Sequence, residues 1–72
     1  MTNQKFNLTE RQRQVMDYIE KYYADNGTTP TQGNIAKEFG IAQATIAKHL
    51  ASIERRGWIQ RARGLKNGMT IL

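Results

Sequence analysis

Three positions within residues 32–50 restrict the fold more than any other feature of the chain. Ala36 is followed four residues later by Gly40, and Ile46 stands six residues further on. In a helix-turn-helix the first of these residues is small because the second helix crosses over it. The glycine turns the chain with a positive φ, and the third residue locks the two helices together. The spacing therefore predicts this motif, with an unrelated packing of three helices as the alternative.

Capping signals delimit the helices around this motif. A capping box at residues 9–12 starts a first helix expected over residues 10–25. Thr31 caps a second helix over residues 32–39, and a third follows the turn and ends before Gly57.

Apolar side chains recur at helical spacing along the first predicted helix. They are Val15, Met16, Ile19, Tyr22 and Tyr23. We expect these residues and Trp58 to form core. The alternative for the aromatic residues is base stacking, as in proteins that bind single strands.

Two short segments after the third helix have the composition of β-strands. Residues 58–61 and 69–72 flank a loop that contains Gly64, which predicts a β-hairpin. The expected fold class is therefore mainly α with a small two-stranded antiparallel hairpin. Residues 8–72 would form one domain after a flexible N-terminal segment, residues 1–7.

The positive charge lies in the C-terminal part of the chain. Residues 1–44 hold five basic and five acidic residues, whereas residues 45–72 hold six basic residues and only Glu54, giving 6 − 1 = +5. A neutral N-terminal part joined to a positively charged C-terminal part predicts a polyanionic partner. Nucleic acid is favoured over anionic lipid as that partner.

Catalytic and metal-binding chemistry is not expected. The 72 residues contain no cysteine, and His49 is the one histidine, so we expect no metal site, cofactor or small-molecule ligand. No apolar run approaches the roughly 18 residues that span a bilayer, so no membrane partner is expected. Cytoplasmic localisation follows as the default, with the protein on the nucleoid when bound.

Residues spread along most of the chain match the motif positions of one known family of domains. They are Leu8, Thr9, Arg11, Gln12, Val15, Asp17, Ile19, Gly27, Pro30, Thr31, Ile35, Ala36, Gly40, Leu50, Gly57, Ile59, Gly64 and Gly68. With the hairpin as a wing, residues 8–72 resemble the winged helix-turn-helix DNA-binding domain of the LexA repressor family.

Two departures limit what this resemblance implies. Residues 41–48 are one residue shorter than the family's usual turn and recognition-helix start and lack its Ser-x-Asn residues, so its operator preference is not transferred. The family's self-cleaving Ser/Lys protease domain has no counterpart in these residues, so no autoproteolysis is expected.

The outward side of the third helix is expected to read DNA in the major groove. It comprises Gln43, Ala44, Thr45, Ala47 and Lys48. Gln43 suits adenine, Lys48 suits a guanine edge or a phosphate, and the alanines allow close approach. The alternative is an ordinary exposed helix surface.

Two further groups are expected to contact the DNA backbone. Thr31 and Gln32 begin the second helix, where N–H groups favour a phosphate, with capping alone as the alternative for Thr31. The wing group comprises Arg61, Arg63, Lys66 and Asn67. The resemblance implies backbone or minor-groove contacts for it, and a solvated charge cluster is the alternative.

These observations predict a protein that binds double-stranded DNA and regulates transcription, as a repressor that acts by occupying its operator. Two rival functions are a protein-interaction module, such as an anti-repressor or assembly adaptor, and the DNA-binding fragment of a longer self-cleaving repressor. We expect a monomer in isolation and a weak homodimer formed on DNA, because the large apolar residues are assigned to one core.

Overall fold

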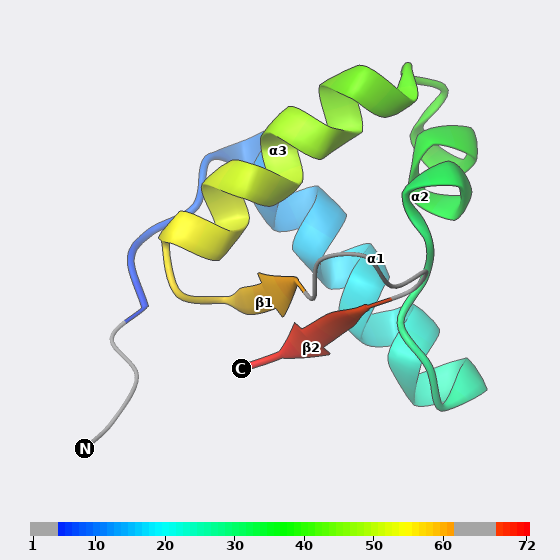
Figure 1. The fold of residues 1–72 in the computed structure, drawn as a ribbon, viewed down its shortest axis with the longest axis horizontal. Coiled ribbons are helices and arrows are strands. Elements are labelled where there is room, and N and C mark those ends of the chain that lie inside the picture. The colour runs from blue at the N-terminus through cyan, green and yellow to red at the C-terminus, as the bar shows by residue number, and fades with distance from the viewer. Residues whose placement is uncertain (1–4, 62–67) are drawn as a thin grey trace.

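Three helices and one hairpin make up the chain in a computed structural model, which describes residues 5–61 and 68–72. The elements are α1 (Glu10–Asn26), α2 (Gln32–Phe39), α3 (Gln43–Arg55), β1 (Ile59–Arg61) and β2 (Met69–Ile71). Helix α3 contacts α1, α2 and β1 and so joins the parts of the fold (Figure 1). The predicted fold class is confirmed. None of the helices in the described part of the chain is long and apolar enough to cross a membrane.

Side-chain caps start the first two helices where the sequence predicts them. The N–H of Gln12 donates to Thr9 Oγ1 at 3.2 Å, and the N–H of Thr9 donates to Gln12 Oε1 at 3.0 Å. The same reciprocal pair joins Thr31 and Asn34, at 2.9 and 3.0 Å. These bonds satisfy N–H groups that a helix leaves free at its start, so both boundaries follow from local chemistry.

The turn between α2 and α3 has the geometry that the motif requires. Gly40 has φ +64°, and the N–H of Ile41 donates to the carbonyl oxygen of Ala36 at 3.1 Å. Ala36 is buried beneath α3, and Ile46 is fully buried. The helix-turn-helix prediction is therefore confirmed.

One core lies between the three helices and the hairpin. Its buried side chains are Val15, Met16, Ile19, Ile35, Ala36, Ile46, Leu50, Ile53 and Ile59. Trp58 packs against this core from one side, as expected.

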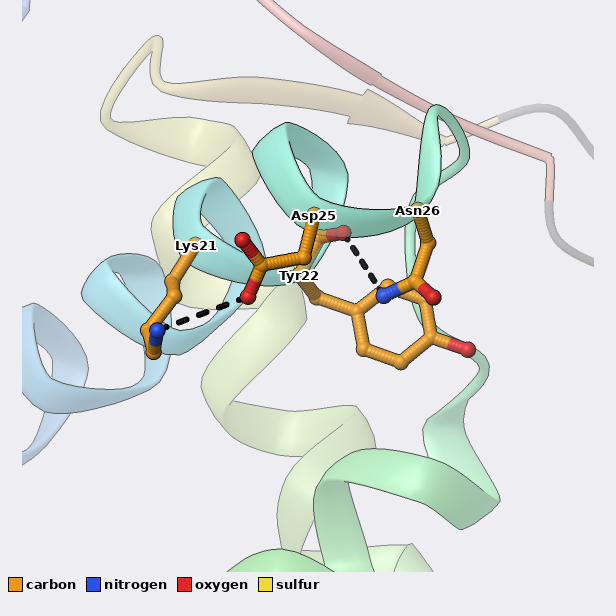
Figure 2. A network of polar contacts seen from close by, with 4 residues as sticks. All are labelled: Lys21, Tyr22, Asp25 and Asn26. Carbon is orange, nitrogen blue, oxygen red and sulfur yellow. Dashed lines mark hydrogen bonds and ion pairs between the residues drawn. The ribbon is translucent and has the colours of Figure 1, made fainter.

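The C-terminal turn of α1 faces solvent, and there the core prediction is wrong for Tyr23, which is 51% exposed. Polar contacts hold this turn: Lys21 Nζ lies 3.4 Å from Asp25 Oδ2, and Asn26 Nδ2 donates to the carbonyl oxygen of Tyr22 at 3.0 Å (Figure 2). The physical reason is length, because α1 extends past the part that α3 covers (Figure 1).

Aromatic rings join α1 to α2 at the edge of the core. The ring centroid of Tyr18 lies 5.9 Å from that of Tyr22 and 5.9 Å from that of Phe39, the latter pair edge to face. Burial raises the pKa of the Tyr18 hydroxyl above its usual 10.0, and the negative charge of Glu38 adds to the rise.

The hairpin closes the remaining side of the core. Ile59 pairs with Ile71 and is buried, and Arg61 pairs with Met69 at the far end of the ladder. Near its start, Trp58 Nε1 donates to the carbonyl oxygen of Phe6 at 2.7 Å. This bond holds Phe6 near the end of α3, and the flexibility expected of residues 1–7 stays a prediction.

Candidate nucleic-acid interface

The outward side of α3 carries the residues predicted to read DNA. Gln43, Ala44, Thr45 and Lys48 are exposed and Ala47 is half-buried, while Ile46, Leu50 and Ile53 on the inward side are fully buried. The division follows from the helical period, which turns residues three and four apart to the same side. The core thus fixes which face of α3 a partner can reach.

The first turn of α2 lies beside the start of α3. A β-carbon placed on Gly33 would stand 3.5 Å from Gln43 Nε2 and 3.6 Å from Thr31 Oγ1. The amide of Gln43 therefore lies close to the N-terminus of α2, where helix geometry leaves the N–H groups of Gln32 and Gly33 without intrahelical acceptors. Two groups that the sequence predicts separately form one continuous surface.

Gly33 was not among the predicted site residues. A glycine in the first turn of a helix gives no functional signal in the sequence, and its role depends on the neighbouring helix. It lies beside the Gln43 amide, at a distance that would place an added β-carbon in ordinary van der Waals contact with Gln43 Nε2.

Arg61 is held by an acidic residue of α3. Arg61 Nε lies 2.9 Å from Glu54 Oε1, and the backbone N–H of Arg61 donates to Glu54 Oε2 at 3.1 Å. Both side chains are about one-third exposed, at 32% and 33%. The structure thus assigns Arg61 a bond inside the protein, and its contact with DNA stays a prediction.

The other residues predicted for the wing, Arg63, Lys66 and Asn67, lie outside the described residues. Among the described cations, Lys48 and Arg55 are exposed on α3 and Arg56 follows it, half-buried. Arg55 and Arg56 add positive charge where the chain passes from α3 to the hairpin, and Lys48 adds it in the middle of α3.

The described residues of this surface include no candidate metal site. No three or more His, Cys, Asp or Glu side chains gather there in a way that could hold an ion. His49 is half-buried on α3. The surface offers donors and positive charge, which suit an anionic polymer.

Comparison with known proteins agrees with this geometry. The family described as LexA DNA binding domain matches residues 5–67. The LexA repressor of Thermotoga maritima is 38% identical over 64 residues, which are 89% of this chain and 32% of that protein. The LexA repressor of Petrotoga mobilis is 41% identical over 63 residues, 82% of this chain and 31% of that protein.

The LexA repressor of Desulfatibacillum aliphaticivorans is 38% identical over 66 residues, 90% of this chain. The chain spans 32% of the length of that relative, and a similar share of the other two. The family match covers most of the chain, and the three helices and hairpin have the matching architecture. The chain belongs to the family of LexA DNA-binding domains, with a winged helix-turn-helix fold.

Proposed function

We propose that this chain binds double-stranded DNA in a sequence-specific way and acts in transcriptional repression by occupying an operator. One observation carries the proposal: the exposed side of α3 and the first turn of α2 form one surface, joined at Gln43 and Gly33. The names of its relatives, LexA repressors, support the same function. Repression would follow when the bound domain excludes polymerase from the operator.

In the proposed complex, α3 lies in the major groove. Gln43 would make a bidentate contact to an adenine, and Lys48 would bind a guanine edge or a phosphate. Ala44 and Ala47 present no bulk to the bases, and Thr45 is exposed beside them. The absence of large side chains there would let the helix backbone approach the groove closely.

The backbone contacts would come from two places. Thr31 and Gln32 would bring the N-terminal end of α2 to a phosphate, because its free N–H groups and helix dipole favour negative charge. Arg63, Lys66 and Asn67 would contact the backbone or minor groove from the wing. Together these contacts would set the orientation of α3, while base contacts would set specificity.

We propose further that these residues act without a cofactor or catalysis, in the cytoplasm, at the nucleoid when bound. Two copies would occupy an inverted repeat. The +5 charge of residues 45–72 argues against the rival function, a protein-interaction module, because such a module does not require positive charge concentrated in one part of the chain.

A selection of duplexes from a random pool tests the proposal, followed by titration of the enriched duplex at several salt concentrations. If about four to six phosphates are neutralised, the log–log slope of affinity against salt is about −4 to −5. A pool without enrichment, or an affinity that does not change with salt, would contradict the proposal and favour the protein-interaction module.

A further inference from the structure

The last cross-strand pair of the hairpin is held from both sides. Arg61 of β1 and Met69 of β2 are cross-strand partners. Glu54 of α3 binds Arg61, and the hydroxyl of Thr29, from the loop before α2, donates to the carbonyl oxygen of Met69 at 3.1 Å. Arg61 is the last residue of β1. At this end of the hairpin, β1 is therefore attached to α3 and β2 to the loop between α1 and α2.

The attachment on the α3 side uses both oxygens of one carboxylate. Glu54 Oε1 accepts from Arg61 Nε at 2.9 Å, and Oε2 accepts from the backbone N–H of Arg61 at 3.1 Å. A side-chain contact alone would leave the strand free to pivot about the long arginine side chain. The bond to the backbone N–H fixes the strand itself relative to α3.

Glu54 carries a negative charge in a part of the chain that is otherwise positively charged. It is the one acidic residue among residues 45–72, which otherwise carry six cations. A carboxylate near a DNA backbone weakens binding through long-range repulsion. If charge alone mattered, removing Glu54 would strengthen DNA binding, so the contact with Arg61 and the charge predict opposite effects.

We propose that Glu54 is a positioning residue for DNA binding, which fixes the end of β1 relative to α3 and thereby holds the strands of the hairpin in place beside the helix proposed to read DNA. The inference rests on the proposed function. Arg61 then contributes by tying β1 to α3. The net effect of Glu54 on affinity is favourable despite its negative charge.

Two variants with the same change of charge separate these effects. Glu54→Gln removes the carboxylate that holds Arg61, whereas Glu20→Gln removes an exposed carboxylate of α1 that lies on a different helix from the contact. Affinity is measured by fluorescence anisotropy on the duplex that the wild-type chain selects, with circular dichroism showing each variant to be folded at that temperature.

We expect Glu54→Gln to bind about three- to tenfold more weakly, with a salt slope less steep by about one, because a phosphate contact of the wing is lost. Glu20→Gln should bind as tightly as the wild type or slightly more tightly. If Glu54→Gln only reduced the fraction of folded protein, the slope of log affinity against log salt concentration would not change. Binding by Glu54→Gln that equals or exceeds wild type, with an unchanged slope, overturns the inference.

Glu54→Asp provides a test at constant charge. Its shorter side chain cannot reach both donors of Arg61, so we expect weaker DNA binding without any change in net charge. Equal binding by Glu54→Asp and wild type would contradict the inference.

Hydrogen exchange followed by NMR examines the contact without DNA. The Arg61 amide should exchange about five- to tenfold faster in Glu54→Ala than in the wild type, since its acceptor is removed. Equal exchange rates would show that Glu54 does not hold the strand. A wild-type chain that selects no duplex would overturn the proposed function and this inference together, whereas a binding wild type with an unaffected Glu54→Gln overturns this inference alone.

Discussion

The side-chain amide of Gln43 lies against Gly33, so the first residue of α3 meets the first turn of α2. A β-carbon on Gly33 would stand 3.5 Å from Gln43 Nε2, which is an ordinary van der Waals distance. The contact brings the residue proposed to read a base next to the helix end proposed to bind a phosphate. Position 33 can therefore accept one methyl group, and a larger side chain would compete with Gln43 for the same space.

Gly33→Ala should stabilise the fold. Alanine loses less backbone entropy than glycine in a helix, which favours the variant by about 0.5–1 kcal/mol. Urea denaturation measures the free energy of unfolding. Gly40→Ala is the control at the other end of α2: Gly40 has φ +64°, so the same methyl group should destabilise by about 1–2 kcal/mol. Destabilisation of equal size at both positions would contradict this account.

Thr31→Ala should destabilise the protein by about 1 kcal/mol, since the N–H of Asn34 then loses its acceptor. Thr31→Ser keeps a hydroxyl at this position and should restore most of the stability. Thermal denaturation of the three proteins side by side provides the measurement. If serine were as destabilising as alanine, the methyl group of Thr31 and not its cap would account for the effect.

Gln43→Ala and Lys48→Ala should each lower the discrimination between selected and random duplexes by about 1–3 kcal/mol, as expected if Gln43 contacts an adenine and Lys48 a guanine edge and not a phosphate. Arg63→Ala should weaken binding to both duplexes nearly equally, as expected of a backbone contact. Parallel titrations with the selected and the random duplex give the ratio of the two affinities for each variant. An unchanged preferred sequence for Gln43→Ala would exclude α3 as the reader at that position.

The Tyr18 hydroxyl should make stability fall at alkaline pH. Burial raises its pKa above 10.0 in the folded chain, so the folded state keeps a proton that the unfolded state releases. Its contribution is complete below pH 10.0 and is lost as the pH rises through the raised value. Tyr18→Phe cannot ionise and should lose less stability between about pH 9 and pH 12. Tyr23→Phe, which alters an exposed ring, should follow the wild type instead.

The domain should be monomeric or weakly associating at micromolar concentration, with two copies on an inverted repeat whose half-sites lie about one helical turn apart. Among the described residues, Phe6 is 56% exposed and Tyr23 is 51% exposed, but one lies near the end of α3 and the other on the last turn of α1. Separate exposed rings do not form the continuous apolar patch of an obligate dimer. Sedimentation velocity with and without duplex measures the assembly, and a tight dimer without DNA would contradict this reasoning.

Local signals in the sequence sufficed for much of the fold. The caps at Thr9 and Thr31 act within three residues of the chain, and Gly40 ends α2 through its own backbone conformation. The inward residues of α3, from Ile46 to Ile53, follow from the helical period. The exposed side predicted to contact DNA was therefore predictable too, as the remainder of the same helix.

Tyr23 shows where local reasoning fails. The helical period places Tyr23 in the same stripe as Ile19, but the length of α1 beyond its partner helices decides that the ring is exposed. Local patterns also do not predict contacts between distant parts of the chain, such as the hydrogen bond that Trp58 Nε1 donates to the carbonyl oxygen of Phe6 across 52 positions.

The sequence by itself determined the helices, their caps, the turn of the motif and the positive C-terminal part, because each depends on residues close together in the chain or on composition. Only the tertiary structure decided that Glu54 holds Arg61, that Thr29 holds Met69 and that Gly33 lies beside Gln43. These contacts depend on how separate helices and strands pack against one another. The hydrophobic effect that drives this packing is not directional, so the pattern of apolar residues does not show which polar side chains will meet. Packing brings the carboxylate of α3 to the end of β1, and hydrogen-bond geometry then fixes the pair.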